Sequence, residues 1–243
     1  MLNLLKKIMQ TGTVTEEYFM SIVPARFRGQ VMMKQWECQN CEGCIAACPT
    51  GALSYSGGKV AVNNDACIFC GQCVETCEKK VLRHSVNYEL AHLAGPLAEE
   101  AAAGRLASKI RSVLGRSLFI RHVDVGSCNA CDFEMSALLN PLYDLQHYGI
   151  DFVASPRHAD LLMVTGVVTR NLHEALLVTY NAAPAPKLVM AVGACAASGK
   201  VFGDTYAIEG SVDKIIPVDI YVPGCPPRPQ ALIYGLLLAL DRL

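Results

Sequence analysis

The residues of this chain that could most readily do chemistry are its cysteines, which number 12 among 243 residues. Eight of them form two runs with the spacing C-x2-C-x2-C-x3-C, the first over residues 38–48 and the second over residues 67–77. No secretory signal is visible ahead of them, so disulfides are not expected, and closely spaced thiolates are typical metal ligands. The two runs therefore predict metal sites.

The spacing of the two runs resembles that of bacterial two-cluster ferredoxins, in which the fourth cysteine of each run ligates the other cluster. The resemblance implies one 4Fe–4S cluster on Cys38, Cys41, Cys44 and Cys77, and a second on Cys48, Cys67, Cys70 and Cys73. Glu78 follows the second run, where the pattern has proline. Zinc is the alternative, since C-x2-C pairs also serve zinc ribbons, but zinc sites use isolated pairs.

The remaining cysteines are Cys128, Cys131, Cys195 and Cys225. Each group of them follows a glycine (Gly126, Gly193 or Gly224) just beyond a run of residues with strand character. Parallel strands end at one edge of a sheet, where ligands bind near the topological switch point, and glycine permits a sharp turn there. We therefore expect a third 4Fe–4S cluster at this edge. The alternative is that some of these thiols are buried structural residues.

The second half of the chain alternates between strand and helix patterns. Apolar runs rich in Val and Ile predict strands over residues 118–125, 150–154, 161–164, 188–192 and 220–222. Helical patterns occupy residues 132–145, 172–180 and 229–240. This alternation predicts an α/β fold, a flavodoxin-like doubly wound parallel sheet, preceded by a small bacterial-type ferredoxin domain.

These patterns divide the chain into four parts. We expect an N-terminal extension over residues 1–30, a two-cluster ferredoxin-like domain over 31–90, a linker helix over 91–117 and the α/β domain over 118–243. A net charge of −1 argues against a nucleic-acid partner, and the apolar composition excludes disorder. The longest clean apolar stretch, residues 231–240, is about half of what spans a bilayer.

Three motifs of the second half resemble a known family. Residues 126–134 (GSCNACDFE), 193–195 (GAC) and 223–227 (PGCPP) are similar to the small subunit of nickel–iron hydrogenases. The likeness is strongest to the energy-converting, complex-I-related branch, which includes formate hydrogenlyase. Residues 6–15 and Phe27-Arg28-Gly29, together with the cluster runs, resemble the ferredoxin-type subunit of the same complexes. The two parts are usually separate chains and are fused here.

The resemblance implies an electron-transfer subunit with three 4Fe–4S clusters, the third being the proximal cluster beside a partner's nickel–iron site. No nickel–iron ligand set remains on this chain, so the large catalytic subunit is an expected partner. The upstream donor would be formate dehydrogenase, a ferredoxin or carbon-monoxide dehydrogenase. We expect a cytoplasmic location, peripheral to the inner face of the membrane through partner subunits.

The spacing Cys128-x2-Cys131 separates two forms of this interpretation. Complex I relatives carry two adjacent cysteines at this place, so the spacing favours hydrogenase over quinone reduction. A quinone-reducing module and a soluble ferredoxin-type carrier remain the alternatives. Glu134 matches the glutamate of the family motif and is a candidate proton relay or orienting group. Its alternative is a helix N-terminal carboxylate that complements the macrodipole.

Helical patterns near the two ends of the sequence, and the six histidines, are also considered as functional candidates. Residues 1–10 have apolar positions at helical spacing around two lysines, which predicts docking on a partner or capping, with a membrane surface as the alternative. Residues 231–240 are apolar nearly all round, and we expect burial against a second subunit. The six histidines fall in no ligand spacing and are interpreted as structural or surface residues.

Overall fold

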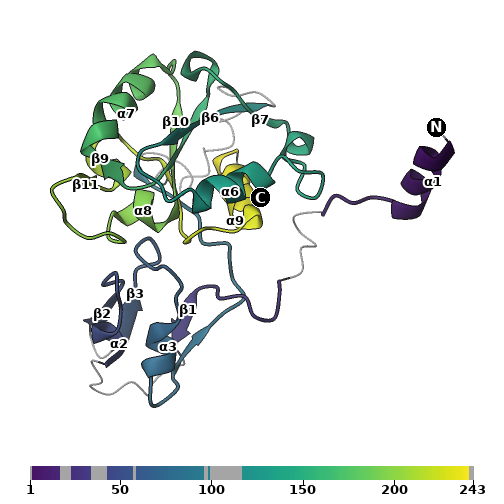
Figure 1. The fold of residues 1–243 in the computed structure, drawn as a ribbon. Helices are drawn as coiled ribbons and strands as arrows, with labels where there is room; N and C mark the ends of the chain where they lie inside the picture. Colours follow the sequence, from purple (N-terminus) through teal and green to yellow (C-terminus); the bar gives the residue numbers. More distant parts are fainter. Residues whose placement is uncertain are drawn as a thin grey trace.

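The computed structural model describes residues 2–16, 23–33, 43–56, 59–95, 98 and 117–240. Two folded units follow the N-terminal helix α1 (Leu2–Thr11), which stands away from both of them (Figure 1). Cys38 and Cys41 lie outside the described residues, as does most of the predicted linker helix. Within the described residues, no helix is long and apolar enough to cross a bilayer.

The described part of the first unit contains two antiparallel strand pairs and two short helices. Strand β1 (Val31–Met33) pairs with β4 (Leu82–His84), and β2 (Leu53–Ser56) pairs with β3 (Lys59–Val62). Helices α2 (Gly43–Ala46) and α3 (Gln72–Thr76) each belong to one cysteine run. The small core of the unit contains cysteines beside apolar side chains, namely Cys44, Cys73 and Cys77 with Val31, Leu53, Val60, Val81 and Leu82.

The second unit contains the predicted parallel sheet. Its parallel strands are β6 (Leu118–Asp124), β7 (Ile150–Phe152), β8 (Leu161–Thr165), β10 (Leu188–Val192) and β12 (Ile220–Val222). The order is β5-β12-β10-β8-β6-β7, with β5 (His92–Leu93) antiparallel at the edge. Without β5 the strands follow the flavodoxin order 2-1-3-4-5, so the predicted fold class is confirmed. The switch point lies between β6 and β8.

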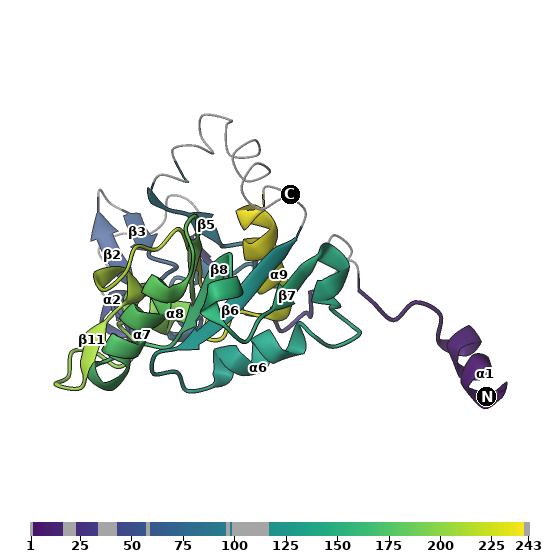
Figure 2. The same ribbon diagram turned by 90° about the horizontal axis from the view of Figure 1, so that it is seen from above.

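Helices cover both faces of this sheet, and each face has its own apolar core. On one face lie α6 (Ala130–Ala137) and α9 (Pro229–Ala239). On the other lie α7 (Arg170–Ala182) and α8 (Gly193–Ser198), and Figure 2 shows the strands between the two layers. Within residues 117–240, the other elements are a strand pair, β9 (Val168–Thr169) with β11 (Ile208–Gly210), and 3-10 turns η2 (Leu145–Tyr148), η3 (Pro156–His158) and η4 (Val212–Lys214).

Two expected elements differ from the structure. The helix predicted over residues 132–145 ends at Ala137 as α6, because the side chain of Asn140 accepts hydrogen bonds from the backbone of Leu142 and Tyr143 and forms a turn there. His92 and Leu93 lie in the range expected for the linker helix, but they form strand β5 of the sheet. The other strand bounds agree with the prediction to within two residues.

Burial of the last helix against a second subunit was the wrong expectation. Helix α9 is apolar on nearly every side because this chain surrounds it: it packs against β12, β5 and α6. Leu232 and Leu236 are fully buried within the single chain. The apolar composition of this helix therefore reflects the chain's own core.

Truncation of this helix core is expected to destabilise the second unit. Leu236→Ala should lower the free energy of unfolding by about 2–5 kcal/mol, because it leaves a cavity between α9 and the sheet. Val178→Ala, on the exposed face of α7, should lower the free energy of unfolding by much less. Urea unfolding followed by circular dichroism measures both. Equal costs for the two variants would contradict the burial of α9.

Candidate iron–sulfur sites

Four thiols gather at the carboxyl edge of the parallel sheet. Cys128 and Cys131 follow β6, Cys195 follows β10 and Cys225 follows β12, as predicted. Burial, together with the charges of the other three thiols and of Asp132, raises the pKa of Cys131 to about 12. Burial, with Cys225 and Cys128, raises the pKa of Cys195 to about 11. The four side chains, called the sheet-edge group below, are therefore close enough to repel one another as thiolates.

Glycine backbone makes this convergence possible. Gly193 has φ +84, and a Cβ there would lie 2.7 Å from Cys131 Sγ. Gly126 and Gly224 also have positive φ, and a Cβ on either would come within 2.6 Å of backbone atoms. The turns that the sequence predicts after these strands are thus present. A contribution of the three glycines to cofactor binding remains a prediction.

A polar network holds the loop that carries Cys128 and Cys131. Asp132 is its centre: Oδ1 accepts a hydrogen bond from Thr165 Oγ1 at 2.8 Å, and Oδ2 accepts one from Ser127 Oγ at 2.8 Å. His122 Nε2 lies 3.1 Å from Asp132 Oδ1 and 2.9 Å from Thr165 Oγ1. Thr165 is fully buried at the end of β8, so the network spans the switch point between β6 and β8. Sequence reasoning assigned His122 no specific place and did not single out Asp132.

Asp124 secures the start of the same loop. One of its carboxylate oxygens accepts hydrogen bonds from the backbone N–H groups of Gly126 and Ser127, each at 2.8 Å. Burial alone would raise the pKa of Asp124, but these bonds and that of the Ser127 hydroxyl outweigh it, and the pKa lies below its ordinary value of 3.8. The charged form is thus the one that stabilises the loop.

Loss of this carboxylate is expected to destabilise the loop at neutral pH. Because the folded-state pKa is lowered, the stability that Asp124 contributes is present above its ordinary pKa and is lost only as the pH falls through the lowered value. Asp124→Asn should therefore lower the free energy of unfolding by about 1 kcal/mol, and this loss should be the same from about pH 5 to pH 8. Urea unfolding over this range measures the deficit. Asp204→Asn, on an exposed loop, is the matched control, and a deficit that grows with pH would contradict this account.

The cysteine runs of the first unit also bring thiols together. Burial, together with the charges of Cys67, Cys70 and Cys48, raises the pKa of Cys73 to about 11. These four, called the second ferredoxin group, are the set that the ferredoxin pattern assigns to one cluster. At Cys48, hydrogen bonds from Thr50 and Ala52 outweigh burial and lower the pKa. Of the other set, Cys44 and Cys77 share the buried core, and Cys38 and Cys41 are outside the described residues.

The donor sets fit iron–sulfur clusters in their chemistry. Both complete groups offer four thiols and no histidine or carboxylate, which is the usual donor set of a 4Fe–4S cluster. In the described part of the chain, no three His, Cys, Asp or Glu side chains converge as closely as a single metal ion needs. A four-iron cluster spans more space than one ion. Desolvated thiols are costly to ionise without a metal, so a bound cluster would relieve the repulsion within each group.

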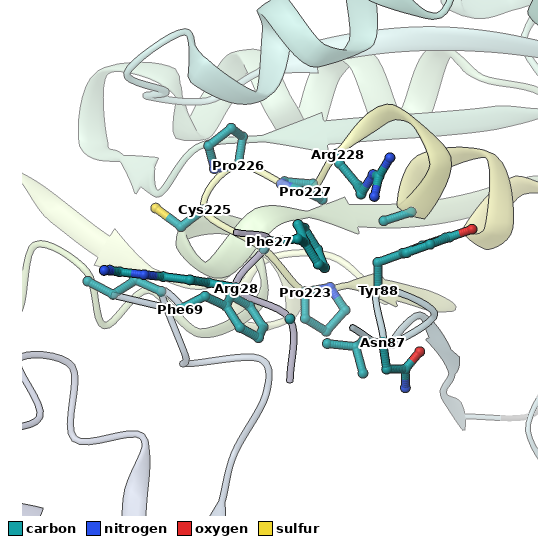
Figure 3. A pocket seen from close by; sticks show the side chains of 15 residues that line it. Phe27, Arg28, Phe69, Asn87, Tyr88, Pro223, Cys225, Pro226, Pro227 and Arg228 are labelled. Atoms are coloured by element: carbon teal, nitrogen blue, oxygen red, sulfur yellow. The ribbon is translucent and has the colours of Figure 1, made fainter. Parts of the chain in front are cut away.

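A cavity of about 260 Å³ lies where the two units meet. Ile68 and Phe69, from the loop of the second ferredoxin group, line one part of it. The loop from Pro223 to Arg228, which carries Cys225, lines another part (Figure 3). Among the described residues, the loop of the second ferredoxin group therefore shares a cavity with the loop of the sheet-edge group.

Glu134 does not occupy the helix position that the macrodipole alternative requires. Helix α6 begins at Ala130, so Asp132 is the acidic residue of its first turn and Glu134 lies further along. The macrodipole alternative therefore applies to Asp132. Burial raises the pKa of Glu134, and the charge of Arg228 opposes that shift. Glu134 thus lies within the electrostatic reach of the loop that carries Cys225.

Comparisons with known proteins agree with this geometry. The family model for the NADH ubiquinone oxidoreductase 20 Kd subunit matches residues 128–239, and that for a 4Fe-4S dicluster domain matches residues 30–78. The probable membrane-bound hydrogenase subunit mbhJ of Pyrococcus furiosus is 49% identical over 130 residues, which cover 54% of this chain and 78% of that protein.

Two further relatives align with different shares of this chain. Formate hydrogenlyase subunit 7 of Escherichia coli is 46% identical over 145 residues, covering 60% of this chain and 56% of that protein. An NADH-quinone oxidoreductase subunit of Citrifermentans bemidjiense is 48% identical over 113 residues, covering 46% of this chain and 66% of that protein. The chain therefore belongs to the complex-I-related family of 20 Kd iron–sulfur subunits of oxidoreductase complexes, with a 4Fe-4S dicluster domain joined ahead of the family domain.

Proposed function

We propose that this chain is the electron-transfer subunit of a multi-subunit nickel–iron hydrogenase. The observation that carries the proposal is the sheet-edge group, four thiols delivered by three strand ends at the carboxyl edge of the sheet, beside a ferredoxin-type unit with two cysteine runs. When bound, each 4Fe–4S cluster accepts and donates one electron at a time. Three clusters, one per set of four cysteines, would link a donor to the partner's active site.

The residues that would hold the clusters are the three sets already named. Cys38, Cys41, Cys44 and Cys77 form the first, Cys48, Cys67, Cys70 and Cys73 the second, and the sheet-edge group the third. The shared cavity favours the second set as the neighbour of the third. The first set would then face the donor, which is formate dehydrogenase, a ferredoxin or carbon-monoxide dehydrogenase.

The spacing of the sheet-edge cysteines favours hydrogenase over quinone reduction. Cys128 and Cys131 are separated by two residues, the hydrogenase-like form of the motif. Two of the relatives are named as subunits of a membrane-bound hydrogenase and of formate hydrogenlyase. Quinone reduction is the second candidate, because a quinone oxidoreductase subunit matches at a similar identity. A large nickel–iron subunit and membrane subunits are the proposed partners, and a cytoplasmic position at the membrane follows from them.

Purification of the native complex tests this proposal. A hydrogenase would contain nickel and would evolve or consume hydrogen, and the chain would contribute about 12 iron atoms in three clusters. A complex without nickel that reduces quinone would support the second candidate. A chain that purifies alone with all of its iron would indicate a soluble carrier. Iron near two clusters' worth would contradict the proposed role of the sheet-edge group.

A further inference from the structure

The motif Phe27-Arg28-Gly29 lies at the junction of the two units, and its backbone is firmly held. Gly29 donates its backbone N–H to the carbonyl of Ser85 at 3.1 Å, and Gln30 donates to the carbonyl of Asn87 at 3.2 Å. A Cβ at Gly29 would lie 2.4 Å from the Asn87 carbonyl oxygen, so glycine permits this close approach. The segment is therefore fixed against the residues that follow β4 and leave the ferredoxin unit.

Arg28 reaches the loop of the second ferredoxin group. Its Nη1 donates a hydrogen bond to the backbone carbonyl of Cys70, and a Cβ at Gly71 would lie 3.3 Å from the same nitrogen. Its Nη2 lies 3.6 Å from Glu75 in an exposed ion pair, which contributes little by itself. Arg28 also lines the cavity that Cys225 lines, and Figure 3 shows it facing the Cys225 loop. The guanidinium of Arg28 thus lies between the loop of the second ferredoxin group and the loop of the sheet-edge group.

Phe27 reaches the loop of the sheet-edge group. The guanidinium of Arg228 lies over the Phe27 ring at 5.2 Å and over the Tyr88 ring at 4.8 Å, and the two rings meet edge to face. Arg228 follows Cys225 by three residues, and its Nε donates to Gln230 Oε1 at 2.7 Å. The aromatic contact therefore ties the start of the ferredoxin unit to the chain segment that positions Cys225.

We propose that Phe27 and Arg28 assist electron transfer between the second ferredoxin group and the sheet-edge group. Phe27 fixes the distance between the two groups, and Arg28 places a positive charge between them. This inference rests on the proposed function and adds two positioning residues to it. The coupled event is the movement of one electron between the groups, in which one group is reduced, the other is oxidised and no bond breaks. A fixed positive charge nearby favours the reduced, more negative state of each group.

The charge is tested by a redox titration of the purified complex, monitored by electron paramagnetic resonance. Arg28→Gln should lower the ratio of reduced to oxidised second cluster about threefold at a fixed potential, which is roughly 28 mV for one electron at 59 mV per tenfold change. The half-exposed position of Arg28 makes this smaller than a buried charge would give. Arg28→Lys keeps the positive charge, so the midpoint potential of the second cluster should stay close to that of the unaltered protein. Arg26→Gln, two residues away and exposed outside the cavity, is the matched control.

The separation is tested by the magnetic interaction between the two reduced clusters. Phe27→Leu should weaken that interaction and leave both midpoint potentials unchanged, because it removes the Arg228 contact but no charge. An unchanged potential in Arg28→Gln, or an equal shift in Arg26→Gln, would overturn the charge role. An unchanged magnetic interaction in Phe27→Leu would overturn the spacing role. Absence of a third cluster in the unaltered protein would instead refute the proposed function itself.

Discussion

Cys195→Ser is expected to remove the third cluster, abolish hydrogen-dependent activity of the complex and leave the first unit intact. Cys195 is the sole cysteine that β10 delivers to the sheet edge, and it is buried beside Cys225 and Cys128. Serine is a poor ligand for iron at this position, and three thiols do not complete the usual four-cysteine set. Iron should fall from about 12 to about 8 atoms per chain.

Iron and sulfide analysis together with a hydrogen assay measures this outcome. Ala197→Ser, a buried alanine two residues further along α8, is the control for the added hydroxyl. That variant should keep its iron and its activity. Full iron content in Cys195→Ser would show that Cys195 is a structural thiol, which is the alternative that the sequence left open.

Gly193→Ala is the second large effect, and it acts through space rather than through a ligand. A methyl group at Gly193 would lie 2.7 Å from Cys131 Sγ, closer than real Cβ contacts come. The residue also has φ +84, where alanine costs about 1–2 kcal/mol. Cys131 would have to move, so we expect selective loss of the third cluster.

Gly203→Ala separates the effect of the steric clash with Cys131 from the effect of backbone strain at positive φ. Gly203 has φ +67, and no atom lies within 4 Å of the position that a methyl group would take, so this variant carries the backbone strain without the clash. It should lose about 1–2 kcal/mol of stability and keep all of its iron. Iron analysis and thermal unfolding of both variants provide the comparison. Equal iron content in the two would show that Cys131 does not need its present position.

The fold could be predicted largely from the second half of the sequence. Short Val- and Ile-rich runs alternating with helical patterns indicate a parallel sheet, and the cysteines that follow Gly126, Gly193 and Gly224 at three strand ends place the thiols at one edge. Both inferences depend on local sequence and on the general geometry of parallel sheets. The strand order and the carboxyl-edge placement of Cys128, Cys131, Cys195 and Cys225 are accordingly as expected.

Tertiary contacts were beyond the reach of the sequence. Asp132, Thr165 and His122 come from α6, β8 and β6, and no local pattern pairs them. The apolar helix α9 gives no sign of which surface covers it, which is why its burial within this chain was not foreseen. The Asn140 turn that ends α6 early is a local signal that could have been read, since Asn before Pro141 commonly starts a turn.

Reduction of the purified native complex with hydrogen gas, followed by electron paramagnetic resonance of this chain's clusters, tests whether electrons pass between the clusters and a nickel–iron site. We expect that hydrogen reduces the clusters, that nickel is present, and that the third cluster's signal is missing in Cys195→Ser while the other two remain. Clusters that stay oxidised under hydrogen but become reduced with a quinol would contradict it.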